Sequence, residues 1–148
     1  MDAPVSELAT DFRLNAFREC AANPGALLLL KQLKLQGKKL GIVTNGSVTV
    51  QQQKLESSGI QPRVDLTLIS EGVGMRKPDP AIFRKAARHF DAEPSACVFV
   101  GDHPEKDIVG AQQVGMYTVW LKNGRNWPNH LGLRPDSSIT QLAELHII

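Results

Sequence analysis

Four short apolar runs are spaced along the chain, and polar or glycine-rich segments separate them. Each run is rich in Val, Ile, Leu or aromatic residues and is bounded by Gly, Asp or Asn, which is typical of β-strands. Because the runs are continuously apolar rather than alternating, we predict strands that are buried on both faces, as in a parallel sheet. The predicted strands are residues 40–43, 66–69, 98–100 and 117–121.

Helical patterns fill the intervals around these strands, and local signals mark their ends. Asp79 is a predicted N-cap with Pro80 at the first helical position, while Gly37 and Gly59 follow the ends of two other helices. The alternation of helix and strand predicts an α/β fold, a Rossmann-like and mostly parallel sheet with flanking helices. The predicted helices are residues 24–36, 47–58, 79–90 and 105–114.

The two ends of the chain fit this alternation poorly. Leu8, Phe12 and Phe17 suggest a helix outside the sheet within residues 1–22, so the α/β domain is expected to occupy residues 23–148. The tail from residue 123 is rich in loop-forming residues. Within this tail, residues 137–145 are predicted to add a short helix or strand.

Composition narrows the function classes. The chain has 148 residues, 42% hydrophobic and 22% charged, which suits one domain with one core. Its net charge of +2 comes from scattered basic residues and argues against a nucleic-acid partner. No apolar stretch is long enough to cross a membrane, and the N-terminus lacks signal-peptide features. Cys20 and Cys97 have no disulfide or metal spacing, so we expect a cytoplasmic protein.

Polar side chains follow three of the predicted strands, and ligands of open α/β sheets bind at such strand ends. A hydroxyl, an amide and a glycine N–H at the start of a helix suit phosphate oxygens, and a lysine adds a compact positive charge. Carboxylates suit Mg²⁺, which keeps water and substrate oxygens as its other ligands. The candidates are Thr44, Asn45, Gly46, Lys77, Asp102 and Asp107.

Each candidate also has an ordinary structural interpretation. Thr-Asn-Gly is a common turn, Lys77 alone would be a solvated charge, and Asp102 could cap the following helix. We expect a turn or surface role for His103, and packing roles for Trp120 and Trp127. The occurrence of all three groups at successive strand ends favours a combined phosphate and metal site.

Taken together, these residues resemble the haloacid dehalogenase (HAD) superfamily, mainly Mg²⁺-dependent phosphatases and phosphotransferases on a Rossmann-like sheet. L-G-I-V-T-N-G is similar to the second family motif at Thr44, and R-K-P-D-P-A-I-F is similar to the third at Lys77. V-F-V-G-D-H-P-E-K-D-I resembles the fourth, with Asp102 and Asp107 as its acidic pair. The resemblance covers residues 24–122 in one order, which makes it specific.

The resemblance implies a role for each candidate in a phosphatase that acts on a small phosphomonoester. Thr44 would hydrogen-bond the transferring phosphoryl group, helped by Asn45 and nearby backbone N–H groups such as that of Gly46. Lys77 would neutralise the phosphoryl group and the nucleophile. Of the acidic pair, Asp102 would bind Mg²⁺ directly or through water, and Asp107 would support the metal or the lysine.

One family motif has no counterpart here. The nucleophilic Asp and the general acid/base of the family lie in a D-x-D motif that ends the first, central strand, and the chain contains no D-x-D. The resemblance therefore predicts an N-terminally incomplete chain that is inactive alone. Residues 1–22 would be the remnant of a helical cap or a linker, most of the cap would be missing, and the core in 23–148 would lack its first strand.

The predicted loss of a central strand leads to three possible outcomes. The strands at 40–43 and 98–100 could pair directly, another chain could supply the missing strand, or the fold could be marginal and self-associate through exposed sheet edges.

Other function classes remain open. A non-catalytic domain that binds phosphate, metal or a protein is one alternative, and a dehalogenase-type hydrolase is another. A response-regulator receiver domain ranks last, because its acidic pair and phosphoacceptor Asp have no correctly placed counterparts. The enzyme assignment rests on the family resemblance, and the expected partner is a small phosphorylated metabolite.

Overall fold

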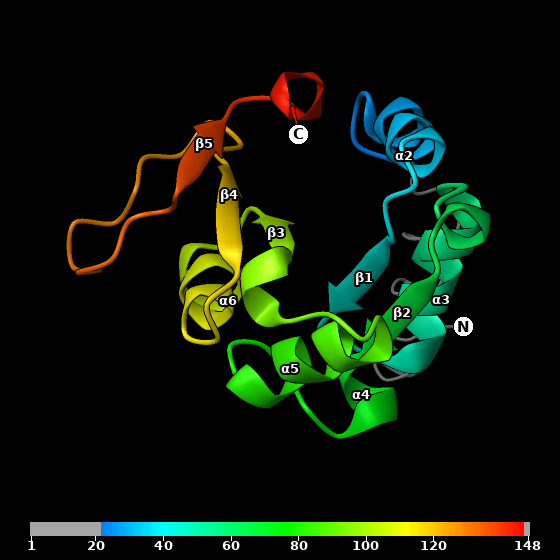
Figure 1. Ribbon diagram of the computed structural model, residues 1–148, viewed down its shortest axis with the longest axis horizontal. Coiled ribbons are helices and arrows are strands. Elements are labelled where there is room, and N and C mark those ends of the chain that lie inside the picture. The colour runs from blue at the N-terminus through cyan, green and yellow to red at the C-terminus, as the bar shows by residue number, and fades with distance from the viewer. Residues whose placement is uncertain (1–21, 147–148) are drawn as a thin grey trace, which may run out of the picture.

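The computed structural model describes residues 22–146 and shows an α/β fold in which every paired strand is parallel. The described strands form two separate sheets, with orders β1-β2 and β3-β4-β5 (Figure 1). The prediction of parallel sheets with flanking helices is therefore confirmed. The strands are β1 (Gly41–Thr44), β2 (Leu66–Ile69), β3 (Val98–Gly101), β4 (Tyr117–Leu121) and β5 (Ser137–Ile139).

Helices connect the strands and cover the sheets. The longest ones are α2 (Ala26–Leu35), α3 (Val48–Ser57) and α5 (Pro80–His89). Shorter elements are α4 (Ser70–Val73), α6 (Gly110–Gln112), the 3₁₀ turns η1 (Gln61–Arg63), η2 (Pro94–Ala96) and η4 (Leu142–Glu144), and the π-helix η3 (Pro104–Val109). None of the helices within residues 22–146 is long and apolar enough to span a membrane.

Two of the long helices begin where the sequence predicts. The Ser47 hydroxyl accepts a hydrogen bond from the Val50 N–H at 3.3 Å at the start of α3. The Asp79 carboxylate accepts one from the Ala81 N–H at 2.9 Å at the start of α5, with Pro80 in the first helical position. Both caps satisfy backbone donors that have no partner inside their own helix, so these starts are fixed locally.

The helix predicted over residues 105–114 is divided into η3 and α6. Its N-cap is His103, whose Nδ1 accepts the N–H of Lys106 at 3.2 Å. The expected turn role of His103 is confirmed, and the capping interpretation of Asp102 is wrong because the adjacent imidazole already satisfies that donor.

The main core cluster joins the two sheets through α5. Ile82 and Phe83 of α5 are fully buried and pack with Leu68 of β2. The Phe83 ring also meets the ring of Phe99 on β3 edge to face, with centroids 5.0 Å apart. One helix therefore packs on strands of both sheets, and its side chains hold them in fixed relative positions.

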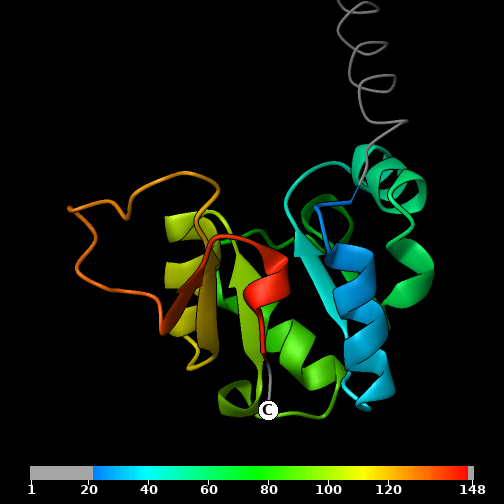
Figure 2. The same cartoon turned by 90° about the horizontal axis from the view of Figure 1, so that it is seen from above.

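The prediction that all four strands are buried on both faces is wrong. Four of the five residues of β4 are buried, but no residue of β1 or β3 is. Within residues 22–146, each of these two strands has one neighbouring strand. Of the three outcomes expected for a missing central strand, the direct pairing of 40–43 with 98–100 is not the one observed, since β1 and β3 lie in different sheets. Their arrows point the same way on either side of an opening (Figure 2).

The C-terminal tail agrees with its prediction. The strand β5 and the 3₁₀ turn η4 lie within the predicted segment 137–145. Trp120 and Trp127 pack edge to face with centroids 5.1 Å apart, and Ile108 completes their cluster, which confirms their packing role. The helix predicted within residues 1–22 lies outside the described residues apart from its last position.

Candidate functional site

The segments that follow β1, β2 and β3 meet at Lys77. Its Nζ lies 2.6 Å from Asp107 Oδ1, and the two side chains are only 13% and 6% exposed. The Asn45 side chain grips the backbone of the same residue, with Oδ1 accepting the Lys77 N–H at 2.8 Å and Nδ2 donating to its C=O at 2.9 Å. The nearly buried ammonium is therefore paired with a carboxylate that follows β3, and the backbone of the same lysine is held by an amide that follows β1.

Asp107 is fully engaged by its neighbours. Besides Lys77 on Oδ1, its Oδ2 accepts the N–H of His103 at 3.0 Å. The strand before it ends in Gly101, where an added Cβ would lie 2.4 Å from the Asp107 Cβ. Only glycine permits this approach, so the Gly101 position is part of what places the carboxylate. The lysine ammonium also lies 5.8 Å from the centroid of the Phe99 ring, a cation–π distance.

Thr44 and Gly46 lie at the entry of α3. The Thr44 hydroxyl lies 3.2 Å from Gln51 Oε1 and donates to it. Gly46 has a φ of 141°, and a Cβ there would be 2.6 Å from the Gln51 amide nitrogen. The Gly46 N–H donates to Ser70 Oγ at 2.9 Å. The Thr44 hydroxyl and the Gly46 N–H, both predicted to bind phosphate, thus each have a hydrogen-bond partner within the protein. A bound phosphate would have to take the place of these partners.

Asp102 belongs to a different local network. Its Oδ2 accepts hydrogen bonds from Arg125 at 2.8 Å and from the Asn123 side chain at 3.2 Å. Its backbone carbonyl accepts the Trp120 indole N–H at 3.0 Å. The Asp102 side chain is 48% exposed, so it is open to solvent in a way that Asp107 is not.

The carboxylates near Lys77 can be compared with the ligands that Mg²⁺ needs. Within residues 22–146, no three His, Cys, Asp or Glu side chains gather closely enough to hold a metal on their own. Mg²⁺ commonly needs only one or two carboxylates, with water and phosphate oxygens completing its octahedron. The half-exposed carboxylate of Asp102 fits such a site. Asp107 already bonds through both oxygens, which fits its alternative role as support for Lys77.

Several contacts at this site were missed by the sequence analysis. Arg125 lies 23 positions after Asp102 in an irregular loop, and no motif links them. Ser70 reaches Gly46 only because β2 ends beside β1. The Gln51 contact has a weak local signal, since this residue lies one turn into the helix that Ser47 caps. Asn45 was predicted to help bind phosphate, but its amide is used to fix Lys77.

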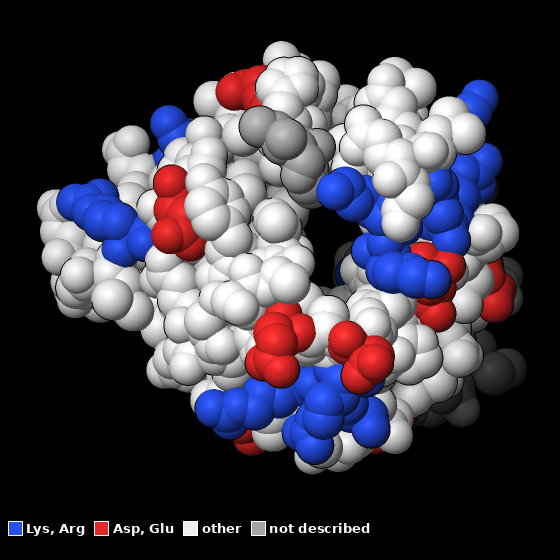
Figure 3. Space-filling model, in the orientation of Figure 1, with Lys and Arg blue, Asp and Glu red and all other residues white. Residues whose placement is uncertain are grey.

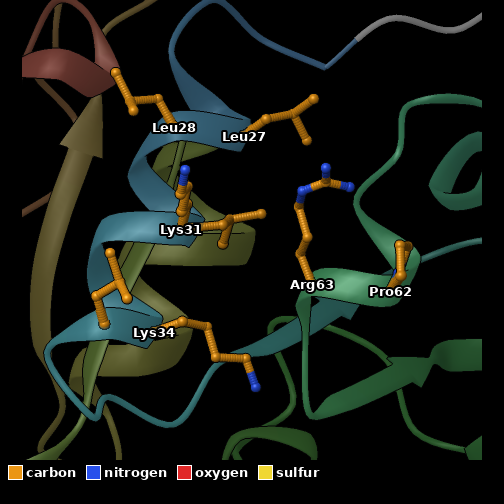
Figure 4. Close-up of a pocket in the computed structure, with 8 residues that line it drawn as sticks. Leu27, Leu28, Lys31, Lys34, Pro62 and Arg63 are labelled. Atoms are coloured by element: carbon orange, nitrogen blue, oxygen red, sulfur yellow. The ribbon is translucent and has the colours of Figure 1, made fainter.

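Two hollows lie near these elements. The larger, of about 810 Å³, lies between α2 and η1 and is lined by none of the predicted site residues (Figure 4). Two of the basic side chains that line it already have partners: Lys34 pairs with Asp65, and the Arg63 guanidinium donates a hydrogen bond to the Gly59 carbonyl. The smaller, of about 390 Å³, adjoins Gly46 and includes Ser70, Glu71 and Arg76. Only the smaller hollow borders the predicted phosphate site.

The sequence is similar to a family of hydrolases. A profile described as haloacid dehalogenase-like hydrolase matches residues 3–115. The phosphoserine phosphatase of Thermus thermophilus is 36% identical over 124 residues, which cover 84% of this chain and 49% of that protein. The pyrimidine 5'-nucleotidase YjjG of Escherichia coli is 37% identical over 134 residues, which cover 89% and 59%. The chain thus spans about half the length of the curated relatives it matches.

Solved structures share the fold. A HAD phosphatase from Thermococcus onnurineus superposes with a TM-score of 0.77 at 29% identity, covering 97% of this chain and 63% of that one. A dehalogenase with an intermediate complex gives 0.83 at 26% identity, covering 96% and 62%. The putative HAD-hydrolase YfnB from Bacillus subtilis bound to magnesium gives 0.74 at 31% identity, covering 81% and 52%.

Proposed function

Because the chain belongs to the haloacid dehalogenase-like hydrolase family, we propose that it carries the phosphate- and Mg²⁺-binding part of a phosphatase site for a small phosphomonoester. The observation that carries this proposal is the Lys77 ammonium, which is almost buried yet lies where the segments after β1, β2 and β3 meet. Burying a charge is costly unless it is paired. An ammonium paired with Asp107, on a lysine whose backbone is bonded by Asn45, differs in this respect from an ordinary exposed surface charge.

The roles proposed for the residues follow from their chemistry. Thr44 would give its hydroxyl proton to a phosphate oxygen in place of Gln51, and the Gly46 N–H would do the same in place of Ser70. Lys77 would neutralise the phosphate charge, with Asp107 keeping the ammonium in place. Phosphoryl transfer depends mainly on such positioning and charge neutralisation.

Asp102 is the residue proposed to hold Mg²⁺. Its carboxylate would exchange the Arg125 contact for the cation, and its exposure leaves room for coordinated water. When bound, Mg²⁺ would neutralise charge on the phosphate oxygens. The name of one structural neighbour, which is bound to magnesium, is consistent with this proposal.

Turnover by this chain alone is proposed to be very low. The sequence has no D-x-D, so the family's aspartate nucleophile has no candidate here. The same observation favours the second candidate function, a non-catalytic domain that binds phosphate or metal. A dehalogenase-type reaction is the third, and it is less favoured because the two acidic residues after β3 suit a cation.

Binding of inorganic phosphate, measured by calorimetry with and without Mg²⁺, tests the proposed site. We expect the wild-type chain to bind phosphate more tightly when Mg²⁺ is present. Lys77→Gln should abolish phosphate binding, and Asp102→Asn should abolish the effect of Mg²⁺. The matched controls are Lys85→Gln and Asp91→Asn, two exposed residues at α5 and just after it, which should behave as the wild type.

Other outcomes would overturn parts of this proposal. No phosphate binding at millimolar levels by a folded wild-type chain would overturn the phosphate site. Equal losses in the Lys85→Gln and Lys77→Gln variants would show a diffuse charge effect. Hydrolysis of an aryl phosphate that disappears in Asp102→Asn would refute the inactivity and require a nucleophile outside the D-x-D pattern. Release of chloride from a 2-chloro acid would favour the dehalogenase alternative.

A further inference from the structure

The smaller hollow, of about 390 Å³, is lined by charged groups that the proposed phosphate site does not use. All of its lining residues except Gly46 come from the segment between β2 and Lys77. The space-filling view shows basic and acidic side chains next to each other over α4 and α5 (Figure 3). The volume of the hollow lies within the range of small-molecule sites, which is roughly 300–1,000 Å³.

The hollow borders the position proposed for phosphate. Gly46 belongs to both, because its N–H is a proposed phosphate donor and the residue lines the hollow. Ser70 also lines the hollow, and its hydroxyl accepts that N–H at 2.9 Å. A phosphomonoester whose phosphate is bound at Gly46 would therefore have the hollow beside it, with room for its organic part.

Two lining residues of opposite charge are available to a ligand. The side chains of Glu71 and Arg76 are exposed, and neither forms an ion pair with a residue in the range 22–146. Glu71 is nevertheless fixed in position. Its Oε1 accepts the Val48 N–H at 3.2 Å at the start of α3, and its own N–H donates to the Gly46 carbonyl at 3.3 Å.

The backbone of Arg76 is fixed relative to the phosphate site. The peptide bond between Arg76 and Lys77 is held at both of its polar atoms. Its C=O accepts the N–H of Asp79 at 2.8 Å, and its N–H donates to Oδ1 of Asn45 at 2.8 Å. Arg76 therefore starts from a fixed point next to the proposed phosphate-binding lysine, which lowers the cost of ordering it around a ligand.

We propose that the hollow is a second subsite, which binds the organic part of a phosphomonoester that carries both a carboxylate and an ammonium group. Such a ligand is a phosphorylated amino acid. The Arg76 guanidinium would donate two parallel N–H bonds to the carboxylate, and the second carboxylate oxygen of Glu71 would accept a hydrogen bond from the ammonium. This inference rests on the proposed function, because it requires a phosphate at Gly46.

The pair of charges discriminates against other phosphomonoesters. An ester with a second phosphate and no cation would gain from Arg76 but would meet the like charge of Glu71, which is unfavourable. An uncharged alcohol would leave both side chains without a partner. The zwitterionic ester is the one whose charges match both residues.

NMR titration of the 148-residue chain with four phosphate esters tests the subsite. The esters are O-phospho-L-serine, O-phosphoethanolamine, the phosphate of 3-hydroxypropanoate, and ethyl phosphate. They carry both charged groups, the ammonium alone, the carboxylate alone and neither. O-phospho-L-serine should bind most tightly, and the loss of each charged group should weaken binding about fivefold, as for an exposed ion pair.

Two variants should each remove one preference. Arg76→Gln should abolish the gain from the carboxylate and keep the gain from the ammonium, and Glu71→Gln should do the reverse. The glutamine amide oxygen in the second variant can still accept the Val48 N–H. The matched controls are Arg84→Gln on α5 and Glu56→Gln on α3, two exposed residues outside the hollow, which should keep both preferences.

Titration with inorganic phosphate separates this inference from the proposed function. Phosphate binding together with equal affinity for the four esters would overturn the subsite and leave the phosphate site standing. The absence of phosphate binding would overturn both. Equal losses in the Arg84→Gln and Arg76→Gln variants would show a diffuse charge effect and would also overturn the subsite.

Discussion

β4 and β1 have similar apolar sequences but very different surroundings. β4 lies between β3 and β5, and four of its five residues are buried. Among the strands of the described part of the chain, β1 has only β2 beside it, and none of its four residues is buried. The comparison teaches that an apolar run specifies a strand but not the number of its neighbours. Burial is decided by which other segments arrive beside it.

The two sheets are nevertheless joined, at one face and at one end. On the face, α5 packs against β1 and β2 and reaches Phe99 of β3 through Phe83. At the carboxyl ends of the strands, Lys77 pairs with Asp107. These two connections are separable by mutation, which allows the contrast between the sheets to be tested.

The largest effect is expected when the connection through α5 is removed. Phe83 is fully buried and packs on elements of both sheets. Phe83→Ala should lower the free energy of unfolding by about 3–5 kcal/mol through lost burial and the cavity left behind. Urea unfolding measures this change. Leu35→Ala, at a side chain that is 79% exposed, is the control and should change stability by less than about 0.5 kcal/mol.

A smaller but still large effect is expected at the ion pair. Asp107→Ala leaves the Lys77 ammonium nearly buried without its partner, and the loss should be about 3 kcal/mol. The double variant Lys77→Met with Asp107→Leu removes both charges and should recover much of that stability. With the single variants Lys77→Met and Asp107→Leu added, a double-mutant cycle by urea unfolding measures the coupling. Simple additivity of the two single variants would contradict the idea that this pair joins the sheets.

The contrast between an inner and an edge strand can be measured with one type of substitution. Val119 of β4 is 3% exposed, whereas Val98 of β3 is 39% exposed. Val119→Ala should cost about 2 kcal/mol, and Val98→Ala less than about 1 kcal/mol, because the same methyl groups lose different amounts of burial. Thermal unfolding compares the pair. Equal costs would mean that β3 is as well covered in solution as β4.

The smallest effect concerns the start of β1. Asp65 pairs with Lys34 and accepts the Leu40 N–H at 2.9 Å, and these contacts lower the pKa of the Asp65 carboxyl. A lowered pKa stabilises the fold above the ordinary aspartate value of about 3.9, and this contribution is lost as the pH falls through the lower native value. Asp65→Asn should therefore make the free energy of unfolding fall less as the pH drops below about 3.9. Chemical shifts of the Asp65 carboxyl against pH give the native pKa, and an ordinary value would contradict the prediction.

The local features of the fold could be read from the sequence. Ser47 and Asp79 cap their helices as predicted because a cap depends on a few neighbouring atoms. The predicted strand at 66–69 has the observed bounds, and the first predicted strand is displaced by one residue, with Thr44 inside β1 rather than after it. Periodicity locates an element well and its ends less well.

The candidate site was predictable in part. The sequence indicated that Thr44, Lys77 and Asp107 belong together, because strand ends in a parallel sheet share one edge. It did not indicate that Asn45 would hold the Lys77 backbone or that Arg125 would pair with Asp102. These contacts depend on loop paths, for which sequence spacing carries little information.

The sequence by itself determined the elements, their parallel order and the residue types that meet at the strand ends. Those properties follow from short-range patterns of apolar residues, caps and turns. The tertiary structure alone decided that β1 and β3 lie in different sheets, and that Asp107 is buried on Lys77 while Asp102 is half-exposed. The physical reason is that neighbours in space are selected by packing over the whole domain, as where α5 packs with residues of both sheets that lie far apart in the sequence.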